Sequence, residues 1–307
     1  MDPVKKEKIF YISDLHLFHL LRNKKASAGA EIAAVIGRAA ENILRESEPG
    51  SFILIDGDTC LNFALFELFT DELGKDARTV VFTLGNHDLW SCPEDTVDAL
   101  TEKYRACLQE RGMYLLQNEL LCFGEEGKPP ERITEKELRE ASPEDLLRRA
   151  SQARRIFFGG VGFAGYEPLF NAKAGLYRYN KTIGFDRDIE IAETRRFEAL
   201  YDRVCSAFGG RDVVVVTHMP LADWCFPARQ RQEEWKKAAK AAKEAGMPFG
   251  GRPGMLEACK PGFIYVSGHT HRNYRYDDGA IRFLADNQFG YNKGEPEAWP
   301  HLKSFEV

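Results

Sequence analysis

The sequence contains no long hydrophobic run, no paired-cysteine motif and no excess of positive charge. Within its 307 residues, no stretch approaches the roughly 18 apolar residues that a membrane helix needs. The seven cysteines are an odd number without a Cys-x-x-Cys pair, which argues against a disulfide framework and indicates a reducing compartment. The 42 basic and 47 acidic residues give a net charge of −5, so nucleic acid is not an expected partner.

The sequence also lacks the marks of a secreted or divided protein. Residues 1–6 lead into a short apolar run without the long apolar stretch and small-residue cleavage site of a secretory signal, so we expect a cytoplasmic location. No Pro/Ser-rich linker splits the chain. A single domain over residues 1–307 is therefore expected. The oligomeric state is left open.

Five short apolar runs, rich in β-branched or aromatic residues, have the length and composition of buried strands. They cover residues 9–12, 52–55, 80–84, 213–216 and 263–266. A polar patch follows each run. The patches are Asp14-Leu15-His16, Gly57-Asp58, Gly85-Asn86-His87-Asp88, His218 and Gly268-His269-Thr270-His271. Because ligands gather outside the carboxyl ends of strands in layered α/β folds, we expect these patches to converge on one crevice.

The donor chemistry of these patches predicts a site for two metal ions. The donors are two Asp, one Asn and four His, without a thiolate, whereas a single structural zinc would use four ligands, usually with Cys. Asp58 can bridge two cations about 3.5–4 Å apart. Such a pair would lower the pKa of a bound water from 15.7 towards roughly 7, so metal-bound hydroxide is the expected nucleophile.

The intervening sequence predicts helices between the strands. Apolar residues at three- and four-residue spacing indicate a helix around residues 32–44. Pro93 is expected to open a helix that ends near Arg111, and Pro143 another. Asp277-Asp278-Gly279 predicts a hairpin turn. Further helices are expected at residues 61–73, 188–207 and 229–245. These elements favour an α/β sandwich of two sheets flanked by helices.

The five patches, in this order, resemble the signature of the calcineurin-like metallophosphoesterases, across residues 14–271. The resemblance implies a four-layer α/β/β/α sandwich of two mixed sheets. It implies that one metal is held by Asp14, His16, Asp58 and His271, and the other by Asp58, Asn86, His218 and His269. His87 would face the substrate phosphate and assist the leaving oxygen, a contribution typically worth about 10²–10⁴-fold in rate.

Three further residues have two readings each. Asp88 is interpreted as a catalytic residue that orients His87, with a helix N-cap as the alternative. His19 is a surface histidine or a substrate contact. Cys60 is a buried, inert thiol or an oxidation-sensitive one.

Inserts at residues 124–188 and 223–262 are expected to form a cap that selects the substrate. Their aromatic and arginine side chains either pack and face solvent or contact ligand. The chain lacks the Asp-Arg-Gly continuation of the serine/threonine protein phosphatases and the ligand tyrosine of the purple acid phosphatases. It looks more like the bacterial phosphodiesterase-type branch. The segment from Asn287 to Tyr291 resembles an Asn-Pro-x-Gly-Tyr ending of that branch, with Gln288 in place of proline, and is taken to support only the fold.

The sequence therefore predicts a phosphodiesterase that depends on two divalent metal ions and acts on a small or nucleotide-like substrate. Mn²⁺ is the first choice, with Fe, Zn, Co and Ni as alternatives. A phosphomonoesterase or protein phosphatase of the same fold is the nearest alternative. A non-catalytic metal-binding scaffold belongs to a different class, and the intact ligand set argues against it. A nuclease would be expected to carry a basic track, which the composition does not indicate.

Overall fold

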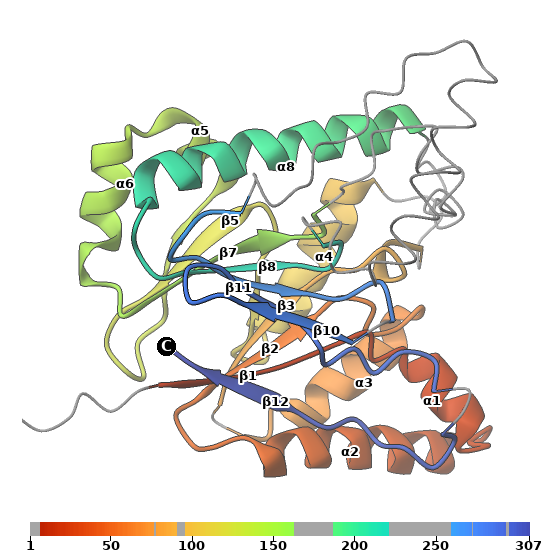
Figure 1. Ribbon diagram of the computed structural model, residues 1–307. Helices are drawn as coiled ribbons and strands as arrows, with labels where there is room; N and C mark the ends of the chain where they lie inside the picture. Colours follow the sequence, from red (N-terminus) through yellow and green to blue (C-terminus); the bar gives the residue numbers. More distant parts are fainter. Residues whose placement is uncertain are drawn as a thin grey trace, which may run out of the picture.

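Two mixed β-sheets stack face to face and helices cover their outer faces (Figure 1). The computed structural model describes residues 7–76, 78–90, 96–162, 187–220, 259–271, 273–292 and 295–307. The first sheet has the strand order β12-β1-β2-β3-β4. Its strands are β12 (Lys303–Glu306), β1 (Lys8–Ser13), β2 (Phe52–Asp56), β3 (Thr79–Thr83) and β4 (Tyr114–Leu115). All neighbours are parallel except β12, which runs antiparallel to β1.

The second sheet has the strand order β10-β11-β9-β8-β7-β5-β6. Its parallel centre consists of β11 (Arg282–Ala285), β9 (Ile264–Ser267), β8 (Val213–Thr217) and β7 (Arg155–Gly160). Antiparallel strands flank that centre on both sides. They are β10 (Tyr274–Asp277), β5 (Glu119–Phe123) and β6 (Glu131–Ile133). The two mixed sheets predicted from the resemblance are confirmed.

Alternation along the strands divides the core into three layers. Ile9 and Tyr11 of β1 point into the layer between the sheets, where they meet side chains of β8 and β9. Phe10 and Ile12 point outwards to the helices of the first sheet. Because both faces of such strands are buried, their sequences are continuous apolar runs rather than alternating ones. This explains why the strands were recognisable from composition.

The helices fall into two groups that cover opposite outer faces. The first sheet is covered by α1 (Leu17–Asn23), α2 (Gly29–Glu46), α3 (Phe63–Leu73) and α4 (Val97–Gln109). The second sheet is covered by α5 (Glu135–Glu140), α6 (Pro143–Arg149) and α8 (Arg187–Phe208). In Figure 1, α2 runs along the bottom and α8 along the top, with the sheets between them. Single-turn helices at Asp88–Trp90 and Ala150–Gln152 complete the described elements.

Most predicted helices are present, and one begins later than expected. The helix expected from Pro93 begins at Val97, because Thr96 is extended and its side chain accepts the Ala99 amide at 3.2 Å as an N-cap. Pro143 opens α6 as predicted, and the Ser142 side chain caps this helix. The hairpin at Asp278 is also confirmed.

Part of the predicted cap falls outside the described residues. The expected helix at 229–245 lies there, as do residues 163–186 and 223–258 of the inserts. The described part of the first insert packs as α5 and α6 against α8, with Leu138 and Leu146 fully buried. Its place is therefore in the outer helical layer, while a cap formed by the other segments stays a prediction.

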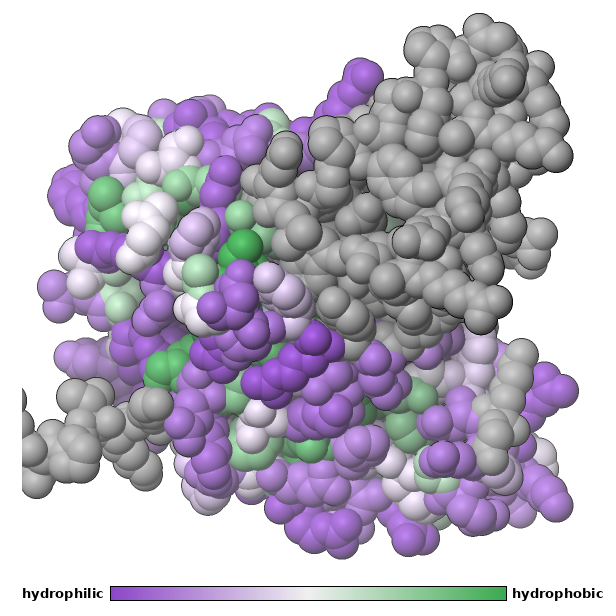
Figure 2. Space-filling view, viewed as in Figure 1, coloured by the Kyte–Doolittle hydropathy of each residue, from purple (hydrophilic) through white to green (hydrophobic). Residues whose placement is uncertain are grey.

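The described surface is mainly polar. In Figure 2, hydrophilic residues dominate the coloured part of this face and apolar residues occur in small separate groups. Among the described residues, Phe18 is the one large hydrophobic side chain that is exposed. No helix in the described part of the chain is long and apolar enough to cross a membrane.

Candidate metal centre

The five polar patches lie close together because the strands that precede them end at the same edge of the sandwich. Ser13 pairs with Asp56 and Asp56 with Thr83, so β1, β2 and β3 finish at the same height. Thr217 pairs with Ser267 at the ends of β8 and β9 in the other sheet. The next residues along each chain segment are therefore delivered to one edge of the sandwich, as parallel strands require.

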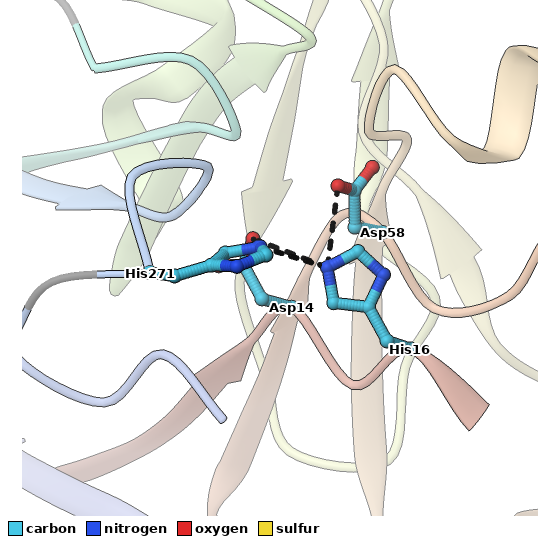
Figure 3. Close-up of side chains that lie close together, drawn as sticks. All are labelled: Asp14, His16, Asp58 and His271. Atoms are coloured by element: carbon cyan, nitrogen blue, oxygen red, sulfur yellow. Dashed lines mark hydrogen bonds and ion pairs between the residues drawn. The ribbon is translucent and has the colours of Figure 1, made fainter. Parts of the chain in front are cut away.

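A first cluster at this edge contains Asp14, His16, Asp58 and His271 (Figure 3). One side-chain donor atom from each of the four lies within 4.8 Å of the others. Nε2 of His16 and Nε2 of His271 are 2.8 Å apart, and Nε2 of His271 lies 3.2 Å from Oδ1 of Asp14. Three of the side chains are buried and His271 is half-buried.

A second cluster shares Asp58 and adds His218 and His269 from the other sheet. Nε2 of His218 lies 3.2 Å from Oδ2 of Asp58. Nδ1 of His269 lies 3.1 Å from Oδ1 of Asn86, which brings the predicted amide ligand into the same group. The seven residues predicted as ligands from five strand ends are thus together, with Asp58 common to both clusters.

Backbone strain is concentrated at the same edge. Eight described residues other than glycine have positive φ, and five of them belong to the clusters. They are Asp14 (55°), His16 (43°), Asp58 (50°), His269 (69°) and His271 (50°). Such conformations cost about 1–3 kcal/mol each and persist only where the surroundings enforce them. The strand ends are therefore bent specifically to turn these side chains inwards.

Three motif glycines are required by close approach to the donors. A Cβ on Gly57 would lie 2.4 Å from Nδ1 of His218, and one on Gly85 would lie 2.2 Å from Oδ1 of Asp58. A Cβ on Gly268 would lie 2.6 Å from Oδ2 of Asp14. The glycines in the patches thus serve the packing of the site itself.

The protonation states differ among the imidazoles: His16 and His269 are neutral, while His218 carries a proton beside the ionised Asp58. Burial lowers the pKa of His16 and of His269 to about 3 in each case. Burial opposes ionisation of Asp58, but the neighbouring His218 holds the Asp58 pKa well below its usual range. Burial also opposes protonation of His218, yet the Asp58 charge raises the His218 pKa to about 10. Without metal, the His218 proton is the main local counter-charge to Asp58.

The orientation of His218 is fixed by a hydrogen bond to the backbone. Its Nδ1 donates to the Asp56 carbonyl at 3.1 Å, because a carbonyl can only accept. That leaves Nε2 directed at Asp58, buried and without a hydrogen bond. Metal-ligating histidines are commonly oriented in this way, by a hydrogen bond from the ring nitrogen that does not bind the metal.

His87 lies beside the shared carboxylate and outside both clusters. Its amide donates to Oδ1 of Asp58 at 2.8 Å, and its Nε2 is 3.8 Å from Oδ2 of Asp58. The Asp88 carboxylate accepts backbone amides of Gly85 at 2.8 Å and Cys60 at 3.1 Å. Asp88 thus ties the loops after β2 and β3 together, and its orientation of His87 stays a prediction.

Sequence reasoning missed or underrated several residues here. Asp56 was not singled out, but it is fully buried, accepts the Thr83 hydroxyl at 2.5 Å and has a pKa raised by burial to about 7. Tyr291 was assigned to the fold alone, but its ring lies 4.6 Å from His16. His19 is half-buried, with its ring 5.9 Å from His16, rather than on the open surface. Cys60 is the predicted buried thiol, and burial raises its pKa.

The residues fit two divalent cations. Donors around an ion at bond lengths of about 2.0–2.2 Å stand up to about 4.4 Å apart, and the donors of each cluster lie within 4.8 Å of one another, so small side-chain movements would complete either shell. Buried carboxylates without full compensation are costly, and a bound cation removes that cost. Nε2 of His218 is buried and directed at Oδ2 of Asp58, so loss of its proton would leave both atoms available to one cation.

Comparison with known proteins agrees with this geometry. The sequence model of the family described as calcineurin-like phosphoesterase matches residues 7–273. The chain belongs to this family. As a calcineurin-like phosphoesterase with two Asp/His clusters, the protein is a metal-dependent phosphoesterase with a site for two metals.

Two solved structures match this calcineurin-like phosphoesterase over nearly its whole length at low sequence identity. The phosphopantetheinyl hydrolase (PptH) of Mycobacterium tuberculosis is 15% identical, with 98% of this chain and 96% of that chain covered and a TM-score of 0.55. A protein of unknown function from Aquifex aeolicus is 11% identical, with coverages of 97% and 95% and a TM-score of 0.32. No curated protein sequence matches significantly. The likeness to the hydrolase shows the fold.

Proposed function

We propose that this protein is a phosphodiesterase that uses two divalent metal ions and acts on a small or nucleotide-like substrate. The observation that carries the proposal is the pair of Asp/His clusters joined by Asp58 at the level edge of both sheets. Two ions bound there would supply an activated water near neutral pH and neutralise the phosphoryl oxygens. The preference for diesters rests on the resemblance of the motifs to the phosphodiesterase-type branch.

The residues have distinct roles in this proposal. Asp14, His16, Asp58 and His271 hold one ion, and Asp58, Asn86, His218 and His269 hold the other. His87 assists the departing oxygen. Its position supports this role because Nε2 lies 3.8 Å from Oδ2 of Asp58, the residue common to both ligand sets, while His87 belongs to neither set.

The ions are proposed to be Mn²⁺. Imidazole and carboxylate donors without thiolate accept Mn, Fe, Zn, Co or Ni, and availability decides among them as much as affinity. Elemental analysis of the purified protein, followed by competition among these metals after chelation, tests the assignment. Another of these metals at about two per chain in the purified protein, or higher turnover with another metal than with Mn²⁺ after restoration, would contradict it. Tighter retention of another metal alone would not, because Mn²⁺ generally binds most weakly of the five.

The hydrolase assay compares two aryl esters on the same protein. Metal-stripped protein and protein restored with Mn²⁺ are assayed with bis-p-nitrophenyl phosphate and p-nitrophenyl phosphate. We expect release from the diester to require metal and to exceed release from the monoester. Absence of metal-dependent release from both esters contradicts the hydrolase, and a diester-to-monoester ratio below one contradicts only the substrate class. The role of His87 is tested in the same assay with His87→Ala, and His301→Ala, which removes an exposed histidine near the C-terminus, is its matched control.

The natural substrate is to be identified by screening the metal-supplemented protein against cyclic nucleotides, dinucleotides, phospholipid head groups and phosphopeptides. A phosphopantetheinyl ester belongs in the panel because a protein of the same fold is named a phosphopantetheinyl hydrolase, although 15% identity carries no substrate across by itself. Turnover of a phosphopeptide above all diesters would favour the protein phosphatase alternative.

A further inference from the structure

Tyr291 is placed among the histidines of the metal centre, although it comes from the loop after β11. The centroid of its ring is 4.6 Å from that of His16 and 4.4 Å from that of His271, both members of the first cluster. The same ring is 4.4 Å from that of His19. Its hydroxyl oxygen lies 3.5 Å from Nε2 of His87.

The loop that carries Tyr291 is attached to the strand end that carries Asp14. The Ser13 amide donates to the Asn287 carbonyl at 3.0 Å, and the Gly290 amide donates to the Asp14 carbonyl at 2.8 Å. The Asn287 side chain donates to the Tyr11 carbonyl at 2.7 Å. These bonds hold the loop against the end of β1, so the position of Tyr291 depends on the same backbone that positions Asp14, a predicted metal ligand.

The chain turns towards the cluster immediately before Tyr291. Gly290 has φ of 67°, and a Cβ there would contact His271 at 3.5 Å. On the other side, the Tyr291 carbonyl accepts the Asn23 side chain from the end of α1 at 3.1 Å. Tyr291 is therefore held from both sides of its backbone.

Ring packing alone does not account for the hydroxyl. A phenylalanine could make the same contacts with His16 and His271. The hydroxyl adds an O–H donor on the side of the ring where His87 stands, and Nε2 of His87 is 3.8 Å from the shared Asp58. The donor is thus placed at the edge of the centre where a phosphoryl group would meet both His87 and the metals.

We propose that Tyr291 is a catalytic residue whose hydroxyl donates a hydrogen bond to a non-bridging phosphoryl oxygen of the substrate, beside His87. This inference rests on the proposed phosphoesterase function. A preorganised donor of this kind stabilises the negative charge that the phosphoryl oxygens carry in the transition state. It also strengthens binding of inorganic phosphate, which presents the same oxygens.

Tyr291→Phe isolates the hydroxyl, and Tyr276→Phe is its matched control. Tyr276 lies in β10 and its hydroxyl donates to the Asp278 carboxylate at 2.9 Å, near the hairpin turn. This turn is at the start of β11, whereas the loop that carries Tyr291 follows the other end of that strand. The measurements are metal content, melting temperature, the Kd of inorganic phosphate for the metal-loaded protein by calorimetry, and kcat and KM separately for bis-p-nitrophenyl phosphate.

For Tyr291→Phe we expect unchanged metal content and melting temperature, phosphate affinity weakened about 10- to 100-fold, and kcat lowered about 10²- to 10³-fold. Tyr276→Phe should match the wild type in metal content, phosphate affinity and turnover. Wild-type phosphate affinity in Tyr291→Phe would overturn the proposal. So would a loss of metal in that variant, because the tyrosine would then act through its histidine neighbours.

The phosphate measurement separates this inference from the proposed function. If the metal-loaded wild type binds phosphate but hydrolyses no ester, the phosphodiesterase assignment fails while the affinity of Tyr291→Phe still decides the role of the hydroxyl. If the metal-loaded wild type does not bind phosphate, the proposed role of Tyr291 fails directly.

Discussion

Gly57 is the position at which a single methyl group should disable the metal centre. Its φ is 68°, and an added Cβ would lie 2.4 Å from Nδ1 of His218. Ordinary van der Waals contact begins at 3.4 Å, so the new methyl group and the His218 ring would have to move about 1 Å apart. The His218 ring cannot yield without loss, since Nδ1 donates to the Asp56 carbonyl and Nε2 faces Asp58.

For Gly57→Ala we expect two separable effects. An L-residue in the left-handed region costs about 1–2 kcal/mol of stability, which lowers the melting temperature of the metal-free protein by a few degrees. Displacement of His218 should weaken metal binding at least as much as loss of a positioning group does, about 10- to 100-fold. Metal should then raise the melting temperature less than it does in the wild type.

Gly112→Ala is the control for the backbone effect. Gly112 has nearly the same φ, 70°, and nothing lies within 4 Å of its added Cβ. Both variants are examined by thermal unfolding in chelator, by metal titration and by elemental analysis after gel filtration. Gly112→Ala should lose stability but keep wild-type metal affinity. Wild-type metal affinity in Gly57→Ala would refute the reasoning, because the strand-end glycine would then not be needed for His218.

Three further predictions concern the same centre. His87→Ala should retain about two metals per chain while turnover falls about 10²- to 10⁴-fold, and loss of metal by elemental analysis would place His87 among the ligands. Asp88→Asn should leave one buried backbone amide, of Cys60 or Gly85, without its acceptor. We therefore expect denaturant titration to show about 1–3 kcal/mol of lost stability, together with weaker metal binding. Unchanged stability with reduced turnover would instead support the proposal that Asp88 orients His87. Without metal, the pKa of His218 is raised to about 10, and coordination needs the neutral ring. Metal binding at pH 7.5 should therefore release a proton from His218. For the same reason, metal affinity should rise with pH up to about 10. Calorimetry in buffers of different ionisation enthalpy measures the released proton, and a binding enthalpy independent of the buffer would contradict this expectation.

The strands and the gathering of the polar patches were predictable because they depend on local sequence and one general rule. Val213 to Val216 is a continuous apolar run, as a strand buried on both faces must be, and His218 follows one residue beyond it. The start of α4 was placed too early, at Pro93, because the proline suggested a first helical position, whereas the Thr96 side chain makes the cap. Helix ends depend on individual side-chain hydrogen bonds, which composition does not reveal.

The sequence by itself determined which residue types stand at the strand ends, and with them the two-metal chemistry. Only the tertiary structure decided which neighbours these residues acquire. Tyr291 reaches His16 across 275 positions because backbone hydrogen bonds join its loop to the end of β1. Asp56 faces no solvent because the sheets close over it. Such contacts join segments that are distant in the chain, so no periodicity or spacing in the sequence encodes them, and they appear only when the two sheets are packed together.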